Sequence, residues 1–351
     1  MKKLNVSEPL ITSSPTIAAL FAVISRQDFA DHWVANNFNN LLFIRNDYEN
    51  RCIFMEDQPS NRETIFSELN FFRYNRIKYD VVNYLSDNIL EFLCRSIDNQ
   101  YYIRVAVDNF YISANKKAYN KNHHLHPLFI YGYDNEKKEF LAGEFFNQKK
   151  FDYYSIPFDE VKEAYCHSEY PKDETEEYLE NIILLKLDDA YVPEPIQLEK
   201  IVEETKSYLC GKDASNKYKY RRRKRDSLYY FGIECYGQFM DDIVQRRVDT
   251  RSAHVILDRI RILAYKLDIL HRHGKMDKDD FGNLNKEVLE LEAEALKNRN
   301  LLLKMLLKHG GADYSDQEAE ALKEKYESLR EKEKQYLGNF VDVILSNSRI
   351  G

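Results

Sequence analysis

The sequence predicts an α+β protein, with a mixed N-terminal domain over residues 1–195 and an all-α C-terminal domain over residues 196–351. All eight prolines lie at or before Pro195, and a long stretch without proline is typical of helical structure. Between residues 101 and 157, β-branched and aromatic runs alternate with short polar turns, which is the pattern of an antiparallel sheet. The length of 351 residues fits two domains of roughly 150 residues each.

The N-terminal part of the chain predicts three helices and two strands. Ser13, Ser14 and Pro15 predict the start of the first helix, because a hydroxyl side chain caps a helix and proline fits its first turn. Apolar residues then recur at helical spacing from Ile17 to Ile24. The same patterns predict a short helix over 28–38, strands over 41–47 and 51–57, and a helix over 78–97.

The middle of the chain predicts the sheet of the N-terminal domain. Strands are expected over 101–113, 126–134, 140–146 and 149–157, and short polar turns join the last three. This spacing predicts an antiparallel meander. The domain is completed by a helix over 158–167, a charged connection over 172–181 and a strand over 182–189.

The C-terminal domain predicts helices separated by one polar linker. The expected helices cover 196–211, 228–245, 250–274, 280–309 and 315–346. Gly274 and the pair Gly310-Gly311 stand where two of these helices should end. The segments 290–310 and 318–337 each have one apolar face, which predicts packing against each other and the first domain or, alternatively, a homodimer interface.

The linker over 212–226 contains the basic run Arg221–Arg225, flanked by tyrosines. Such a run most simply predicts a solvated connection. Two alternatives stay open: it docks an acidic carrier protein, or it contacts nucleic acid through phosphates and stacking.

Composition excludes several classes of protein. Lys and Arg total 51 against 58 Asp and Glu, and the net charge of −7 argues against a general nucleic-acid binder. No glycine precedes Gly132, so the N-terminal third carries no phosphate-binding or dinucleotide loop. Five cysteines without a CxxC motif indicate a reducing compartment. No apolar run is long enough to span a membrane, so we expect a cytoplasmic protein that uses no cofactor.

The strongest indication of a functional site is the histidine-rich segment HHLHPLFIYGYD over 123–134. His126 stands at the entrance to a strand, and Glu144 lies on the next one, so neighbouring strands can bring the two together. An imidazole oriented by a carboxylate is the base half of a nucleophilic triad. The alternatives are a partly buried histidine beside two solvated ones, or zinc held by His123 and His126. No further ligand for zinc stands nearby.

The segment VAVDNFYISANKKAYNKNHHLHPLFIYGYDNEKKEFLAGEFF over 105–146 resembles the butirosin biosynthesis protein H N-terminal family. These are papain-like, peptidase C39-like proteins of natural-product and antibiotic biosynthesis clusters. The segments 156–165, 182–189 and 248–267 also fit this resemblance. The residues that match the family pattern are Asp108, His126, Gly132, Asp134 and Glu144.

The resemblance implies a papain-like fold and an acyltransferase or other thioester-processing activity. In that family an acyl group passes from the thioester of an acyl or peptidyl carrier protein to a cysteine and then to an amine, giving an amide. His126 and Glu144 are then the expected catalytic pair. The expected binding residues are Asp108, His123, Tyr133 and Asp134.

The sequence departs from the family at the nucleophile. The first helix has no cysteine and offers Ser13, Ser14 and Thr16 instead, and Glu144 replaces the more usual Asp or Asn. Three hypotheses follow: Ser13 or Ser14 is the nucleophile, activated by His126; the protein is a pseudoenzyme that binds a carrier protein as a non-catalytic scaffold; or a cysteine elsewhere has taken over or the first helix lies elsewhere in the sequence. We expect catalysis by cysteine to be absent, since no cysteine stands at a helix start beside a histidine.

Overall fold

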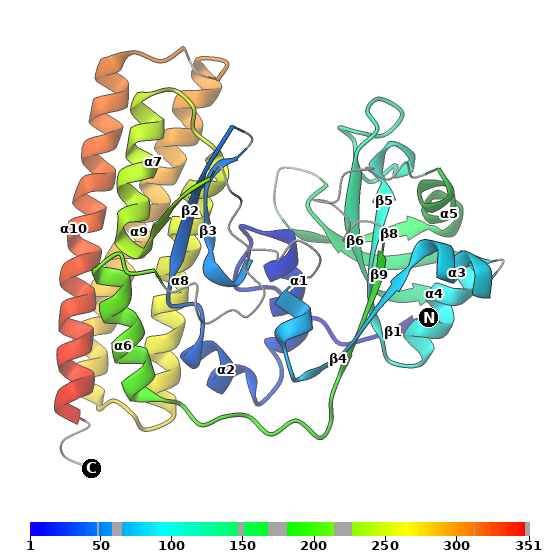
Figure 1. Cartoon of the computed structure of the whole chain (residues 1–351), viewed down its shortest axis with the longest axis horizontal. Helices are drawn as coiled ribbons and strands as arrows, with labels where there is room; N and C mark the ends of the chain where they lie inside the picture. Colours follow the sequence, from blue (N-terminus) through cyan, green and yellow to red (C-terminus); the bar gives the residue numbers. More distant parts are fainter. Residues whose placement is uncertain are drawn as a thin grey trace. The chain divides into compact units, whose positions relative to one another are not determined.

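The structure is a computed structural model, and it describes residues 1–47, 49–57, 65–86, 88–146, 151–167, 181–213, 227–311 and 313–347. The chain is α+β and divides into two compact units (Figure 1). Unit 1 comprises Met1–Gln27 and Pro59–Val192, and unit 2 comprises Asp28–Gln58 and Pro193–Gly351.

Unit 1 is organised around an antiparallel sheet. Its described strands are β1 (Lys2–Lys3), β4 (Phe72–Lys78), β5 (Tyr102–Asp108), β6 (Leu125–Asp134), β7 (Glu139–Glu144), β8 (Asp152–Pro157) and β9 (Asn181–Leu187). Their order is β4-β9-β5-β6-β7-β8, and β1 pairs with the last part of β6. The predicted meander is confirmed as β6, β7 and β8.

Helices cover both faces of this sheet. They are α1 (Pro15–Ile24), α3 (Tyr79–Leu85), α4 (Ile89–Asp98) and α5 (Phe158–Cys166). α1 lies on one face, whereas α3, α4 and α5 lie on the other (Figure 1). Since both faces are covered, all seven residues of the central strand β5 are buried.

The predicted helix over 78–97 is wrong in one respect, because two helices replace it. The side chain of Asn88 accepts a hydrogen bond from the amide of Leu90 at 3.1 Å, and this cap starts α4 as a separate helix. Strand β4 was not predicted. It pairs along its whole length with β9, although three basic residues interrupt its apolar pattern.

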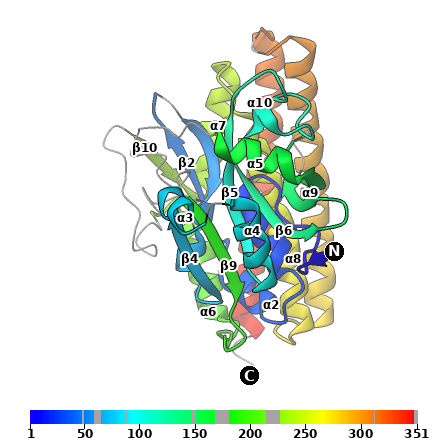
Figure 2. The ribbon, with the colours of Figure 1, turned by 90° about the vertical axis from the view of Figure 1, so that its right-hand side faces the viewer.

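Unit 2 combines long helices with a small sheet. Its described helices are α2 (Ala30–Asn36), α6 (Leu198–Leu209), α7 (Cys235–Val244), α8 (Thr250–Arg272), α9 (Lys278–Lys308) and α10 (Asp316–Asn347). Its described strands are β2 (Leu41–Arg45), β3 (Asn50–Phe54) and β10 (Leu228–Phe231), in the order β10-β2-β3. Strands β10 and β2 lie side by side (Figure 2). Gly274 and Gly310 follow α8 and α9 with positive φ of 65° and 64°, as expected for residues that end helices.

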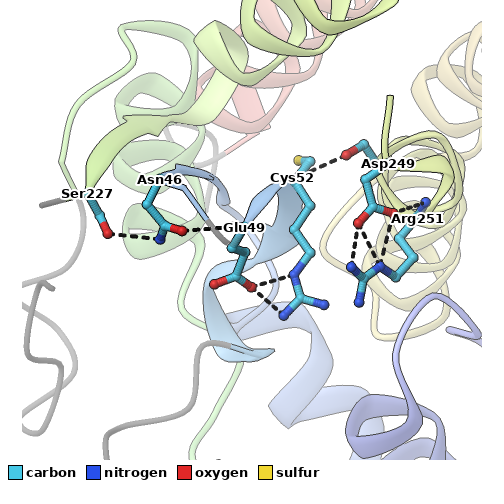
Figure 3. Close-up of polar contacts among 8 residues, drawn as sticks. Asn46, Glu49, Cys52, Ser227, Asp249 and Arg251 are labelled. Carbon is cyan, nitrogen blue, oxygen red and sulfur yellow. Dashed lines mark hydrogen bonds and ion pairs between the residues drawn. The ribbon is translucent and has the colours of Figure 1, made fainter. Parts of the chain in front are cut away.

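Residues 28–58 belong to unit 2, and this corrects the predicted domain boundaries. Strand β2 pairs with β10 along its length, and the amide of Cys52 in β3 donates a hydrogen bond to Oγ of Ser252 in α8 at 2.9 Å (Figure 3). Because these partners come from the C-terminal half of the chain, the segment folds with that half. The first domain is therefore not continuous over 1–195, and the second is not all-α: residues 228–231, predicted as helix, form β10.

Polar side chains hold the turn of the β2–β3 hairpin. Nδ2 of Asn46 donates to Oγ of Ser227 at 3.0 Å, which ties the turn to the start of β10 (Figure 3). The amide of Glu49 donates to Oδ1 of Asn46 at 2.7 Å, and Nε of Arg51 donates to Glu49 at 2.6 Å. A buried apolar cluster of Leu42, Ile44, Ile53, Met55 and Phe231 packs on one face of this sheet.

Some predictions fall on parts of the chain that the structure does not describe. The basic run Arg221–Arg225 and all but the last residue of the charged connection over 172–181 lie outside the described residues. The helices α9 and α10 contact each other, and a homodimer through them stays a prediction. Within the described segments, no helix is long and apolar enough to cross a membrane.

Candidate functional site

A pocket of about 460 Å³ opens in unit 1 where β5 ends and β6 begins. The loop over 109–124 supplies most of its walls, and β6 and the end of β7 supply the rest. The residues that line it are Asn109, Asn115, Lys117, Ala118, Asn122, His123, His124, His126, Glu144, Phe145 and Phe146. The pocket thus contains the two predicted catalytic residues His126 and Glu144.

Asp108, the last residue of β5, fixes the shape of the loop. Its Oδ1 accepts hydrogen bonds from the amides of Phe110 and His124, both at 3.0 Å, and its Oδ2 lies 2.6 Å from Nδ1 of His123. Burial acts to raise the pKa of Asp108, but the bonds from His123 and the two amides outweigh it, so the pKa lies below its usual value. This predicted binding residue therefore holds the pocket loop in shape and orients His123. The ring of His123 stacks on that of Phe110, with 4.2 Å between the ring centres.

His126 and Glu144 form the predicted pair. His126 lies opposite Val107 of β5, and the register of β6 with β7 places His126 and Glu144 diagonally on one face of the sheet. Nδ1 of His126 is 3.2 Å from Oε2 of Glu144. The other oxygen of Glu144 accepts the amide of Phe145 at 2.7 Å. The prediction that the two side chains meet on neighbouring antiparallel strands is confirmed.

The pair determines the proton chemistry of the imidazole. Burial acts to lower the pKa of His126, but the charge and hydrogen bond of Glu144 outweigh it, so the pKa lies above the usual histidine value. A carboxylate beside Nδ1 favours a proton on that nitrogen, which leaves Nε2 as the nitrogen that accepts a proton. The ring of His124 stacks beside that of His126 at 5.5 Å.

Tyr133 and Asp134 do not belong to this site, which corrects their prediction as binding residues. They lie seven and eight residues along β6 from His126, roughly 25 Å away at ~3.3 Å per residue. The hydroxyl of Tyr133 donates to Asp98 of α4 at 2.9 Å. Asp134 accepts the amides of Glu136 and Lys137 and so holds the turn between β6 and β7. Both residues therefore serve the fold of the sheet.

The predicted serines stand at the start of α1, as expected. The helix begins at Pro15 with Ser14 as its N-cap residue, and Oγ of Ser13 is buried without a hydrogen-bond partner. In its first turn, Oγ1 of Thr16 accepts a hydrogen bond from Nη2 of Arg104 in β5 at 2.9 Å. Arg104 stands three residues before Val107, the partner of His126, and its positive charge acts to lower the pKa of His126.

The predicted approach of the first helix to His126 stays a prediction. The described contacts of His126 include Glu144 and His124 but neither Ser13 nor Ser14.

Cysteine and metal chemistry find no support in the described pocket. None of the five cysteines lines it: Cys52 and Cys235 are buried in unit 2, and the other three are Cys94, Cys166 and Cys210. Burial raises the pKa of Cys94 to about 11. Among the described residues, no group of three or more potential ligands could hold a metal ion.

Sequence reasoning missed most of the pocket's walls. Asn109, Asn115, Lys117 and Asn122 line it beside the histidines. The sequence feature that could have identified these residues is the polar run between β5 and β6, which contains no aspartate or glutamate.

In comparisons with known proteins, no family model and no curated sequence matches this chain. The resemblance to the butirosin biosynthesis protein H family therefore stays a prediction.

Proposed function

We propose that this protein transfers an acyl group from a carrier-protein thioester to an acceptor amine, with His126 as the general base. The observation that supports it is the His126–Glu144 pair in an open pocket whose described lining contains no serine, threonine or cysteine. A base without a nearby hydroxyl or thiol suits a reaction in which the acceptor itself is the nucleophile. The substrate class comes from the family resemblance.

The proposed reaction is a direct transfer without an acyl-enzyme. The amine nitrogen attacks the thioester carbonyl, forming the C–N bond. Nε2 of His126 takes the proton that the nitrogen loses. The C–S bond then breaks, and the proton passes to the departing sulfur, which leaves an amide and a free carrier thiol. Glu144 stabilises the imidazolium that exists between the two proton transfers.

The papain-like fold belongs to the same proposal. It is supported by an antiparallel sheet in which a histidine begins one strand and a carboxylate ends the next. Because the described pocket lining contains no serine, threonine or cysteine, we propose a variant of that fold that has lost its nucleophile position.

The test is an amide-forming assay with an acyl-loaded carrier protein and a panel of primary amines, analysed by mass spectrometry. His126→Ala should reduce the rate by about 10²–10⁴-fold, the usual contribution of a general base. His309→Ala is the matched control, because it removes a histidine–glutamate pair from unit 2, where His309 lies 3.1 Å from Glu318. That control should retain the wild-type rate.

The pH profile gives a second readout. The base acts in its neutral form, so the rate should rise with pH through the pKa of His126. Glu144→Gln removes the charge that raises this pKa, and the midpoint should move to lower pH. An unmoved midpoint contradicts the role of the pair.

Intact-protein mass spectrometry separates direct transfer from a covalent route. We expect no acyl adduct on the protein. An adduct that is lost in Ser14→Ala would overturn direct transfer and restore the serine hypothesis.

The second candidate is a non-catalytic scaffold that docks a carrier protein. It is favoured by the lining of the described pocket, which contains neither Ser13 nor Ser14. A protein that binds the loaded carrier but forms no amide with any amine would be such a scaffold.

A further inference from the structure

The loop that forms the pocket carries positive charge without acidic residues. From residue 109 to residue 133 the sequence contains three lysines and three histidines but no aspartate or glutamate. The whole chain, by contrast, has a net charge of −7. The positive charge of this segment is therefore a local feature, and it calls for an explanation at the pocket itself.

The fold brings part of this charge to the pocket. Lys117 lines the pocket and is exposed, and the structure gives it no acidic partner among the described residues. The neighbouring Lys116 is also exposed but does not line the pocket. Lys121 is turned to the loop itself, since its Nζ donates to the carbonyl oxygen of Lys116 at 3.0 Å.

The carboxylates at the pocket do not cancel this charge toward a ligand. Asp108 is 4% exposed, and its oxygens are engaged by His123 and two backbone amides. Glu144 is also 4% exposed, and its oxygens are engaged by His126 and the amide of Phe145. Each carboxylate thus holds an imidazole in place and faces away from solvent.

Amide groups add neutral donors to the same walls. Oδ1 of Asn115 accepts the amides of Lys117 and Ala118 at 3.3 and 3.2 Å. This fixes the side chain and leaves its Nδ2 as a donor. Asn122 is exposed beside His123 on the rim. A lysine, imidazoles and amide donors around one cavity form the donor set that recognises a phosphate group.

We infer that this pocket binds a phosphate-bearing ligand, with the phosphate held by Lys117 and His123 at the rim and its organic part against Phe145 and Phe146. The inference rests on the proposed function in that it concerns the same pocket, and it names what that pocket recognises. A phosphate on the flexible arm of a carrier protein and a free phosphate compound share this chemistry. The aromatic wall favours a ligand with an organic part over inorganic phosphate.

The experiment measures binding by isothermal titration calorimetry, without any acyl group or acceptor. The probes are 4′-phosphopantetheine, pantetheine without phosphate, and inorganic phosphate. We expect 4′-phosphopantetheine to bind at least about tenfold more tightly than pantetheine, as one charge-assisted hydrogen bond provides. Inorganic phosphate should bind more weakly than 4′-phosphopantetheine and should compete with it. The affinity for 4′-phosphopantetheine should fall as salt is raised.

Two neighbouring lysines provide the variant and its control. Lys117→Gln should weaken 4′-phosphopantetheine roughly tenfold and leave the affinity for pantetheine unchanged. Lys116→Gln removes the same charge one residue away, outside the pocket, and should keep wild-type affinity. Equal losses in both variants would show that only general charge attracts the ligand and would overturn the inference. Equal affinity of the wild type for pantetheine and 4′-phosphopantetheine would overturn it as well.

This test and the test of the proposed function fail separately. Phosphate-dependent binding in a protein that forms no amide contradicts the acyl transfer and leaves the phosphate site standing. Amide formation that is indifferent to the phosphate and to Lys117 contradicts the phosphate site and leaves the transfer standing.

Discussion

Replacing Lys266 by methionine should flatten the pH dependence of the stability of unit 2 between pH 7 and pH 9. Lys266 lies in α8 and is 2% exposed. Its Nζ donates hydrogen bonds to the carbonyl oxygen of Asn37 and to Oδ1 of Asn39, and Asn39 in turn donates to Glu204. Burial, together with the positive charge of Arg259, lowers the pKa of Lys266 from 10.5 to about 7.

The sign and the size of the effect follow from proton linkage. Between pH 7 and pH 9 the unfolded chain keeps the proton on Lys266, whereas the folded chain loses it. Stability therefore rises with pH in this window, by about 1.4 kcal/mol per unit at most, or roughly 3 kcal/mol in total. Below pH 7 the cost of the buried charge is fully present. Lys266→Met removes this titration. It also lowers the stability by an amount that does not depend on pH, because the oxygens of Asn37 and Asn39 lose their hydrogen-bond donor.

The assay is urea unfolding at half-unit steps from pH 7 to pH 9, followed by tryptophan fluorescence. The chain has a single tryptophan, Trp33, and it lies in α2 of unit 2, so the signal reports on this unit. Lys304→Met is the matched control, since Lys304 is exposed on α9, and it should keep the wild-type slope. Equal slopes in the wild type and Lys266→Met would refute the reasoning, whatever the offset between the two curves.

Three further predictions concern stability and cysteine reactivity. Asp108→Asn should lower the free energy of unfolding by about 1–3 kcal/mol at pH 7; because the pKa of Asp108 is lowered in the folded state, urea unfolding should show this loss shrinking below pH 4. Gly232→Ala should lower the free energy of unfolding by about 2–4 kcal/mol, since φ is +57° and a Cβ would lie 2.2 Å from a carbonyl oxygen of α6. Gly282→Ala, in open space on α9, should raise it by about 0.5–1 kcal/mol. Thermal unfolding measures both changes. Brief iodoacetamide treatment at neutral pH should label the exposed Cys166 and Cys210 before the buried cysteines, as measured by peptide mass spectrometry; a faster, histidine-dependent label on one cysteine would revive a cysteine enzyme.

The local pattern of strand-like runs and short turns was enough to predict the β6–β8 meander and the contact between His126 and Glu144. The turns between β6, β7 and β8 are short, so neighbouring strands in the sequence are also neighbours in the sheet. The contact of His126 with Glu144 follows from that register, and it could be predicted because both residues lie on adjacent strands.

Pairing between distant segments could not be predicted in this way. The apolar runs of β2 and β3 identify two strands, but their third partner, β10, is a four-residue strand far along the chain. Strand propensity records how a residue fits a half-buried pleated surface and does not name the neighbour. The same limit applies to α1, because the side of the sheet on which it packs depends on the connection and not on its cap or its apolar stripe.

The segment 28–58 has a consequence for the order in which the chain can fold during synthesis. Leu228, the first residue of β10, follows Arg45, the last residue of β2, by about 180 positions. At ~5–20 residues per second, a ribosome takes roughly 10–40 s to add them.

For most of that interval the β2–β3 hairpin is outside the ribosome without its third strand. The apolar residues Leu42, Ile44 and Ile53 then lack Phe231, which completes their cluster, and β2 has an open edge of the kind that pairs with other chains. All strands of unit 1 are complete by Leu187, so that unit can fold first. The nascent chain therefore exposes an aggregation-prone hairpin while unit 1 is already able to fold. We expect a chaperone that binds short apolar strands to bind this hairpin.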